Sequence, residues 1–192
     1  MDSNVLIIAG ATIGGALAGG GIAFGVAIWR ERYKENKVKE GLINLLINDV
    51  GSLLKLYDEL IGENVKQHDE KEIFTSYLVV KQDYFSVFDN NSDRLSYLDD
   101  ETSKLLIQFY NRAKAHIDTI VRYGKHFEDY RNLPPSIEYM GDIMRREREA
   151  NYLRTLFKFI RDNHFELEEM ALETLLALKK QSKKYKKNYK SG

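Results

Sequence analysis

The order of apolar and polar positions divides the chain into an uncharged first segment and a longer amphipathic remainder. Residues 5–29 contain no charged side chain, and Thr12 is the single polar one among them. As a helix, this segment would be about 37 Å long, enough to cross a hydrocarbon core of about 30 Å with some tilt. The pattern therefore predicts a transmembrane helix over residues 5–29, after a short external N-terminus of residues 1–4.

Apolar residues at helical spacing continue directly after this segment and predict a second helical stretch over residues 30–62. We interpret it as a juxtamembrane stalk that continues the membrane helix, with Gly62 at its end. The positions that repeat at intervals of three and four residues are Val38, Leu42, Leu45, Leu46, Val50, Leu53, Tyr57 and Leu60.

Residues 63–178 carry the pattern of a helical domain with one irregular part. Residues 63–98 lack a clear period. Within them, residues 73–80 are rich in β-branched and aromatic side chains and fit either a short strand or a helical turn. Asp99 is expected to be the N-cap of a helix over residues 100–130, because its side chain can accept a hydrogen bond from a free backbone N–H of the first turn.

Both prolines of the chain stand in the break at residues 132–135. A long helical region follows, and Asn163–His164 is expected to bend or split it. Because no sheet pattern is present, the predicted fold class is all-α, with one N-terminal transmembrane helix plus a cytosolic three- to four-helix bundle. Residues 63–178 form the helical cytosolic domain in this scheme, and residues 179–192 form a basic C-terminal tail.

Seven of the thirteen glycines of the chain lie within the predicted membrane helix, although glycine lowers helix stability. Small residues let membrane helices approach closely, so this composition predicts a specific association between helices. The plain alternative is that glycine is common in membrane helices in general. One small-residue face would pack against a neighbouring helix and comprises Gly10, Ala11, Gly14, Ala18, Gly21 and Gly25. A second face would line a pore in a closed homo-oligomeric ring and comprises Thr12, Ala16, Gly19 and Ala23.

The net charge of zero, from 29 basic and 29 acidic residues, conceals an uneven distribution. Residues 30–40 carry five basic and three acidic side chains, residues 41–178 carry 17 basic and 25 acidic ones, and residues 179–192 carry seven lysines without an acid. The basic residues directly after Trp29 place this end of the helix in the cytoplasm under the positive-inside rule. We therefore expect a single-pass protein of the inner (cytoplasmic) membrane, with its N-terminus outside and its C-terminus in the cytoplasm.

A cleaved signal peptide is the competing interpretation of the first segment. The triplet Ala16-Leu17-Ala18 imitates a cleavage site, but Met1–Asn4 contains none of the basic residues that precede the apolar part of a signal peptide. The sequence therefore favours a membrane helix that is retained.

The sequence offers little catalytic chemistry. It has no cysteine, and its histidines, at 68, 116, 126 and 164, lie far apart and outside any metal-binding motif. Asp89–Asp93 opens like a calcium-binding loop, but Arg94 and Asp100 occupy positions where such a loop needs glycine and glutamate. We interpret it as a turn closed by Asn and Asp side chains. No nucleotide-binding loop or hydrolase motif is present, so we expect neither an enzyme nor a bound cofactor or metal.

The C-terminal lysines are the strongest polar signal, because they repel one another and favour an anionic partner. Near a membrane, that partner would be the anionic lipid of the cytoplasmic leaflet. Because Tyr185 and Tyr189 stand among the lysines, the partner would instead be a nucleic-acid oligomer. Its phosphates would contact the lysines and its bases would stack on the tyrosines. The third interpretation is a disordered, solubilising tail. The candidate anion contacts are Lys179, Lys180, Lys183, Lys184, Lys186, Lys187 and Lys190.

Residues 84–101, with the sequence Tyr-Phe-Ser-Val-Phe-Asp-Asn-Asn-Ser-Asp-Arg-Leu-Ser-Tyr-Leu-Asp-Asp-Glu, and residues 107–110 resemble a segment of small bacterial single-pass membrane proteins with a helical cytosolic domain. The layout of the whole chain is similar to that of the membrane effector of two-gene bacterial anti-phage systems such as Hailong. This resemblance implies a protein that oligomerises into an ion channel, controlled by oligonucleotides that a partner nucleotidyltransferase makes. It assigns no functional residue in this chain.

Together these patterns predict a homo-oligomeric, single-pass membrane ion channel or pore-forming effector, gated by its cytosolic helical domain, in bacterial antiviral defence. Its partners would be membrane lipid, further copies of the chain and a regulatory protein. The alternative is a non-conducting, membrane-tethered interaction module that recruits a protein, an anionic lipid or a nucleic acid.

Overall fold

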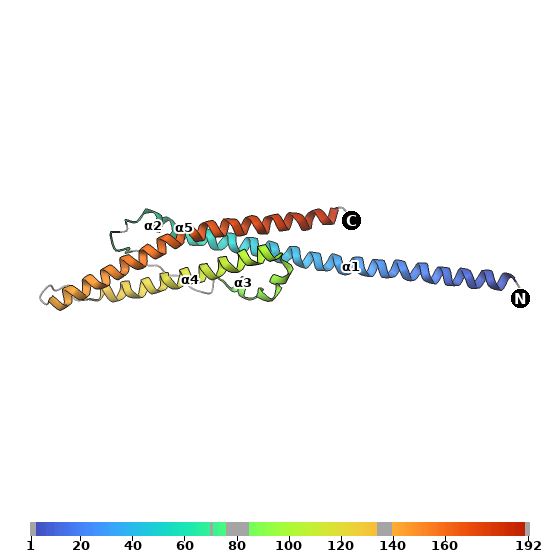
Figure 1. Cartoon of the computed structure of the whole chain (residues 1–192), viewed down its shortest axis with the longest axis horizontal. Coiled ribbons are helices and arrows are strands. Elements are labelled where there is room, and N and C mark those ends of the chain that lie inside the picture. Colours follow the sequence, from blue (N-terminus) through green and yellow to red (C-terminus); the bar gives the residue numbers. More distant parts are fainter. Residues whose placement is uncertain (1–2, 70, 76–84, 134–139, 191–192) are drawn as a thin grey trace. The chain divides into compact units, whose positions relative to one another are not determined.

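The computed structural model describes the backbone of residues 3–69, 71–75, 85–133 and 140–190 and, within these ranges, the side chains of residues 26–186. Every regular element in these ranges is a helix, which confirms the all-α prediction (Figure 1). The elements are α1 (Ser3–Tyr57), the π-helix η1 (Asp58–Gly62), α2 (Glu63–Gln67), α3 (Ser86–Asp89), the 3-10 helix η3 (Ser92–Tyr97), α4 (Asp100–Arg131) and α5 (Met140–Lys190).

The chain divides into two compact units, residues 1–41 and residues 42–192. In the first unit, the side chain of Trp29 is exposed and its ring stacks on that of Tyr33, with 5.6 Å between the ring centroids. No helix in the part of the chain with described side chains combines the length and the apolar composition that a membrane crossing needs. Of the predicted membrane span, residues 5–25 have side chains outside the described part.

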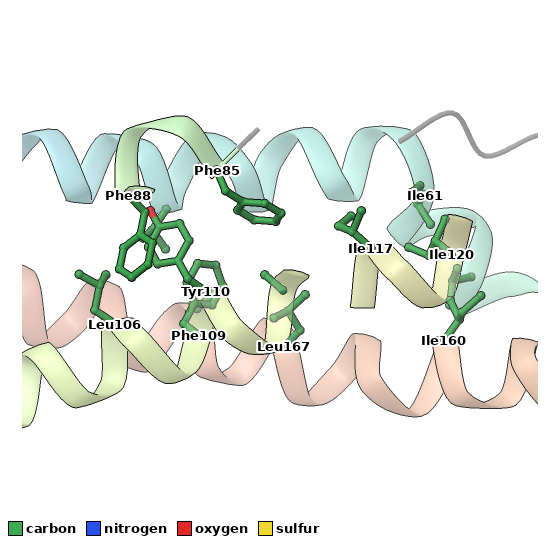
Figure 2. Close-up of a cluster of buried hydrophobic side chains, with 14 of the residues drawn as sticks. Ile61, Phe85, Phe88, Leu106, Phe109, Tyr110, Ile117, Ile120, Ile160 and Leu167 are labelled. Atoms are coloured by element: carbon green, nitrogen blue, oxygen red, sulfur yellow. The ribbon is translucent and has the colours of Figure 1, made fainter. Parts of the chain in front are cut away.

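The core of the second unit lies between its part of α1, α4 and α5. On α4 the buried positions recur at intervals of three and four residues, so one face of the helix meets the core. They include Ala113 and, labelled in Figure 2, Leu106, Phe109, Tyr110, Ile117 and Ile120. Burying each of the larger apolar side chains contributes about 1.5–3 kcal/mol to folding, so this face stabilises the unit together with the buried residues of α1 and α5.

Two hydrogen bonds show how α1 and α5 run past one another in this unit. His164 of α5 contacts Tyr57 at the end of α1, whereas Ser182, later in α5, donates to Asn44, earlier in α1. The two helices are therefore antiparallel. Helix α4 lies beside α5 along the chain's most extensive helix–helix contact in the described part (Figure 1).

Several local expectations are confirmed and others are wrong. Asp99 caps α4 as predicted, since its Oδ1 accepts from the backbone N–H of Thr102 at 2.8 Å. Gly62 does not end the first helical stretch, because η1 and α2 carry helical structure on to Gln67. Helix α5 is not split at Asn163–His164, because His164 faces the core and is held there.

The described residues of 63–98 form the short helical elements α2, α3 and η3, without a long helix, and contain a side-chain-closed turn. Asn91 Nδ2 donates to the carbonyl of Val87 at 2.8 Å, and the Ser92 hydroxyl donates to that of Asp89 at 3.1 Å. The Asp89 carboxylate is paired with Lys114 of α4. Of the candidate strand at residues 73–80, residues 73–75 have no regular structure and residues 76–80 lie outside the described part.

Replacing the cap residue of α4 tests this description of the fold. Asp99→Ala should lower the free energy of unfolding by about 1 kcal/mol, because a backbone N–H of the first turn loses its acceptor. Asp99→Asn is the control, since its amide oxygen can accept the same bond and should preserve stability. Urea unfolding followed by circular dichroism measures both, and equal losses would show that the cap is not the cause.

Candidate functional site

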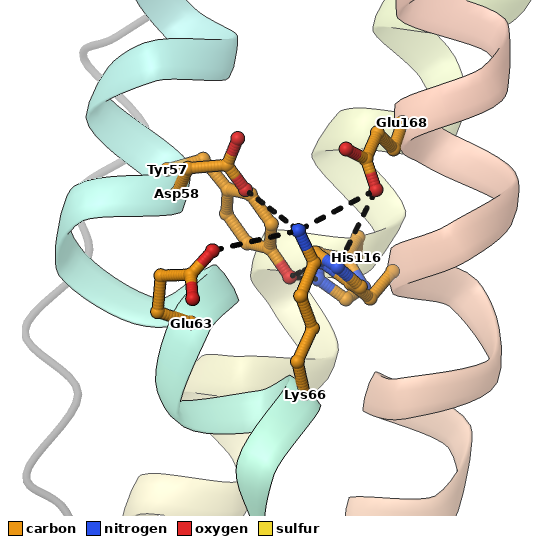
Figure 3. A network of polar contacts seen from close by, with 7 residues as sticks. Tyr57, Asp58, Glu63, Lys66, His116 and Glu168 are labelled. Carbon is orange, nitrogen blue, oxygen red and sulfur yellow. Dashed lines mark hydrogen bonds and ion pairs between the residues drawn. The ribbon is translucent and has the colours of Figure 1, made fainter.

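One tyrosine hydroxyl joins three helices in the second unit. Tyr57, the last residue of α1, lies between His116 on α4 and His164 on α5. Its hydroxyl oxygen is 2.9 Å from His116 Nε2 and 3.1 Å from His164 Nδ1, and its ring stacks on that of His164. Both imidazoles are at most 2% exposed. We call these three side chains the tyrosine–histidine network (Figure 3).

The network has a favoured direction of hydrogen bonding. A tyrosine hydroxyl donates one hydrogen and accepts another, so one histidine donates to it and the other accepts from it. If Tyr57 donates to His164 Nδ1, the proton of neutral His164 is on Nε2, on the side of Glu168, whose Oε2 is 3.8 Å away. His116 then donates from Nε2 to the tyrosine oxygen. The opposite direction would place a lone pair of His164 beside a carboxylate, which is electrostatically unfavourable.

Charged side chains surround one end of the network. Lys66 Nζ lies 3.9 Å from Asp58 Oδ1, 3.7 Å from Glu63 Oε1 and 3.7 Å from Glu168 Oε2 (Figure 3). Three carboxylates therefore share one ammonium group beside His164. The excess of negative charge favours a proton on this imidazole, whereas burial disfavours one.

The backbone departs from α-helical geometry where the network begins. Asp58–Gly62 is the π-helix η1, a wider turn of a kind that is frequent at functional sites. A Cβ atom on Gly62 would overlap Asp58 Oδ1 and lie 3.2 Å from His164 Cε1. Glycine at this position therefore allows His164 to approach the turn closely.

Burial controls the protonation of all three side chains. Burial, with the charges of His164 and Arg112, lowers the pKa of His116 to about 4. Burial also lowers the pKa of His164; Lys66 acts in the same direction, and the surrounding carboxylates oppose it. Burial and two neighbouring carboxylates raise the pKa of Tyr57. At neutral pH the network thus consists of two neutral imidazoles and a phenol that keeps its proton.

Proton uptake would reverse the direction of the network. Once His164 is protonated, both of its ring nitrogens donate, so Tyr57 must turn its hydrogen toward His116. His116 can accept it at Nε2 only in the tautomer that carries its own proton on Nδ1, so the reversal also requires a change of the His116 tautomer. The arrangement therefore has two states that differ by one proton.

Among the described residues, no group of three or more His, Asp and Glu side chains is placed to hold a metal ion.

An apolar cavity of about 50 Å³ adjoins the network. Tyr57 lines it together with aliphatic and aromatic side chains that include Leu54, Phe85, Phe109 and Leu167. This apolar lining offers a water molecule few hydrogen-bond partners.

The residues singled out from the sequence lie elsewhere. The predicted helix-packing and pore-lining positions all belong to the part of α1 whose side chains are outside the described residues. They are Gly10, Ala11, Gly14, Ala18, Gly21, Gly25, Thr12, Ala16, Gly19 and Ala23. The lysines from 179 to 190 belong to α5, which continues through residue 178 without interruption. Five of them are exposed, namely Lys179, Lys180, Lys183, Lys184 and Lys186; the side chains of Lys187 and Lys190 lie outside the described part.

The sequence does contain a signal for the network. His116 lies between Ala113 and Ile120 in the apolar repeat of α4, and His164 lies between Ile160 and Leu167 in that of α5. A titratable side chain at a core position needs a buried partner, because an unpaired polar group there is costly. The partner itself, Tyr57, cannot be identified from spacing alone.

Comparisons with protein-family models, curated proteins and solved structures find no significant match to this chain.

The lowered histidine pKa values predict that acid destabilises the protein. Unfolded, His116 takes up a proton near its ordinary pKa of 6.5, and folded only near 4, so stability is lost as the pH falls between these values. The loss reaches roughly 3 kcal/mol at the lower end. His116→Gln, which can still bond Tyr57 but does not titrate, should flatten the dependence of the urea midpoint on pH. His126→Gln, outside the network, should not. Equal pH dependence in His116→Gln and the unsubstituted protein would contradict the assignment.

Two glycine substitutions test the close approach at η1. Gly62→Ala should cost about 1–3 kcal/mol, because the added methyl group displaces Asp58 and His164. Gly51→Ala is the matched control on α1, where a Cβ meets nothing within 4 Å. It should stabilise the helix by about 0.5–1 kcal/mol. Thermal unfolding of both variants measures the difference, and a neutral Gly62→Ala would count against a tight network.

Proposed function

We propose that this protein is a homo-oligomeric, single-pass membrane ion channel whose cytosolic helical domain controls its opening. One observation carries the proposal. Residues 5–29 contain no charge and yet hold seven glycines, which fall with alanines on two faces of a helix. A helix that only anchors a protein gains more from leucine and valine, so close packing between copies explains the small residues better.

The described end of the first unit supports a membrane boundary near Trp29. Val26, Ile28 and Trp29 are exposed, which suits contact with lipid or with other helices. The stacked rings of Trp29 and Tyr33 stand where basic residues begin, at Arg30. Aromatic rings beside basic residues are typical of the cytoplasmic membrane interface, and they support the inner membrane with the C-terminus inside.

The tyrosine–histidine network supports a domain that switches. It links the C-terminal end of α1 to α4 and α5, and its hydrogen bonds have two directions that differ by one proton. A bistable element of this kind is what a gate needs, because a small chemical change can shift its population. Tyr57 and the proposed membrane segment belong to the same helix, α1, which supports a coupling between the network and the channel. Bacterial defence against phage is the setting that the layout of the chain favours.

A second candidate function follows from the surface of α5. Several large apolar side chains of this helix are exposed, with Phe159, Phe165, Leu172 and Leu176 each more than half accessible. Exposed apolar side chains in such number mark binding surfaces for proteins or membranes. They favour a membrane-tethered module that recruits a partner without conducting ions.

Substitutions in the small-residue face separate these two functions. Gly14→Leu and Gly21→Leu should break the oligomer and abolish conductance in planar bilayers, because leucine prevents close approach of the helices. Leu17→Val, which leaves both small faces intact, is the control and should conduct normally. Size measurements on detergent-solubilised protein report the oligomer directly.

The opposite results would support the tether. If both leucine variants assemble and conduct like the unsubstituted chain, or if that chain is a monomer, the channel proposal is wrong. A tether further predicts that replacing residues 5–29 by a leucine helix leaves partner binding unchanged.

A further inference from the structure

The C-terminal part of α5 has two different sides. Its inner side packs on the domain: Leu178, Gln181 and Ser182 are buried, and Tyr185 packs against the core. Its outer side presents Leu172 and Leu176, which are 51% and 68% exposed, followed by exposed Lys179 and Lys183. The intervals of four, three and four residues place these four side chains in one line along the helix. We call them the α5 stripe.

The helix that carries the stripe is held in place by the fold. The Ser182 hydroxyl donates to Asn44 Oδ1 at 3.4 Å, and the Tyr185 hydroxyl donates to the carbonyl of Tyr97 at 3.4 Å. The lysines therefore stand on an ordered helix, not on a disordered tail. An ordered row of lysines holds its charge at a fixed surface and loses less side-chain and backbone freedom on binding than a flexible tail would.

The bond between Ser182 and Asn44 joins the helix of the stripe to a part of α1 that follows soon after the proposed membrane segment. Asn44 follows Trp29 by only fifteen residues. This connection belongs to α1 and spans about 22 Å as a helix. If Trp29 is held at a membrane surface, the chain itself tethers the stripe to that membrane and gives it a high effective concentration of lipid headgroups.

We propose that the α5 stripe docks on the anionic cytoplasmic leaflet of the membrane, with its leucines at the acyl boundary and its lysines on lipid phosphates and carboxylates. This inference rests on the membrane location proposed above. Lysines supply the attraction to anionic headgroups, and exposed leucines in line with them gain by entering the interface. A nucleic-acid strand would use the lysines but would give Leu172 and Leu176 no apolar partner, so a lipid surface fits the stripe better.

A spin label tests the docking in the full chain. Because the chain lacks cysteine, Leu176→Cys gives a unique labelling site. The protein is reconstituted into vesicles of phosphatidylcholine alone and into vesicles with about 30 mol% phosphatidylserine. With the anionic lipid, collisions of the label with dissolved oxygen should rise and those with a water-soluble nickel complex should fall. Raising the salt to about 0.5 M should reverse both changes.

Charge reversal supplies the matched comparison. Lys179→Glu/Lys183→Glu in the labelled protein should weaken docking by more than roughly 30-fold. Loss of two basic side chains alone accounts for about 30-fold, and the two new carboxylates add repulsion from the anionic lipid. Lys104→Glu/Lys158→Glu alters two exposed lysines outside the stripe and should leave docking unchanged.

The outcomes separate this inference from the proposed function. If carbonate washing extracts the protein from the vesicles, the membrane location is wrong. If the protein stays in the vesicles but the label is equally accessible to the nickel complex in both lipids, only the docking is wrong. Shielding of the label by an added oligonucleotide on neutral vesicles, without an effect of phosphatidylserine, would assign the stripe to nucleic acid and overturn the proposal.

Discussion

The fold of residues 42–192 depends on satisfying three polar side chains inside an apolar helix core. Tyr57, His116 and His164 are each on a different helix, and each needs the others, because a buried polar group without a partner costs about 1–3 kcal/mol. Rotating or sliding α4 or α5 by a single residue would leave its histidine without a partner, and moving α1 would leave all three groups unpaired. The hydrophobic face of a helix tolerates such a shift more easily than a hydrogen bond does, so the network fixes the register that the apolar residues alone leave open.

This constraint also explains the irregular backbone beside Tyr57. The π-helix η1 and the missing side chain at Gly62 allow His164 to pack against the turn. The same place holds Lys66 among three carboxylates. The carboxylates favour a proton on His164, but burial and Lys66 outweigh them, so the pKa of His164 is lowered and the network is neutral at neutral pH. Stability and switching therefore have one origin, since the groups that specify the packing are those whose protonation would disturb it. In the proposed channel, this is the property that lets the domain act on α1.

The sequence predicts what depends on local order and fails where distant residues meet. Asp99 can be identified as a cap because its acceptor role needs only the next three residues, and the helical period locates α4 and α5. Gly62 does not end the helical stretch and α5 is not split at Asn163–His164, because both expectations rest on local preference, which packing against another helix overrides. The network cannot be predicted from the sequence for the same reason. His116 and His164 each stand in an apolar repeat, but nothing local connects them to Tyr57. For the small-residue faces of residues 5–25, the sequence remains the basis of the prediction.

The most direct measurement of the central claim is a comparison of unfolding free energies for Tyr57→Phe alone and for Tyr57→Phe combined with His116→Leu and His164→Leu. Removing only the hydroxyl should cost about 1–3 kcal/mol, because two buried imidazoles lose their shared partner. Replacing both imidazoles as well removes the unpaired groups, so the triple variant should be at least as stable as the single one. A triple variant whose loss equals the sum of the three separate losses would show that the side chains do not act as one network, and it would contradict the account.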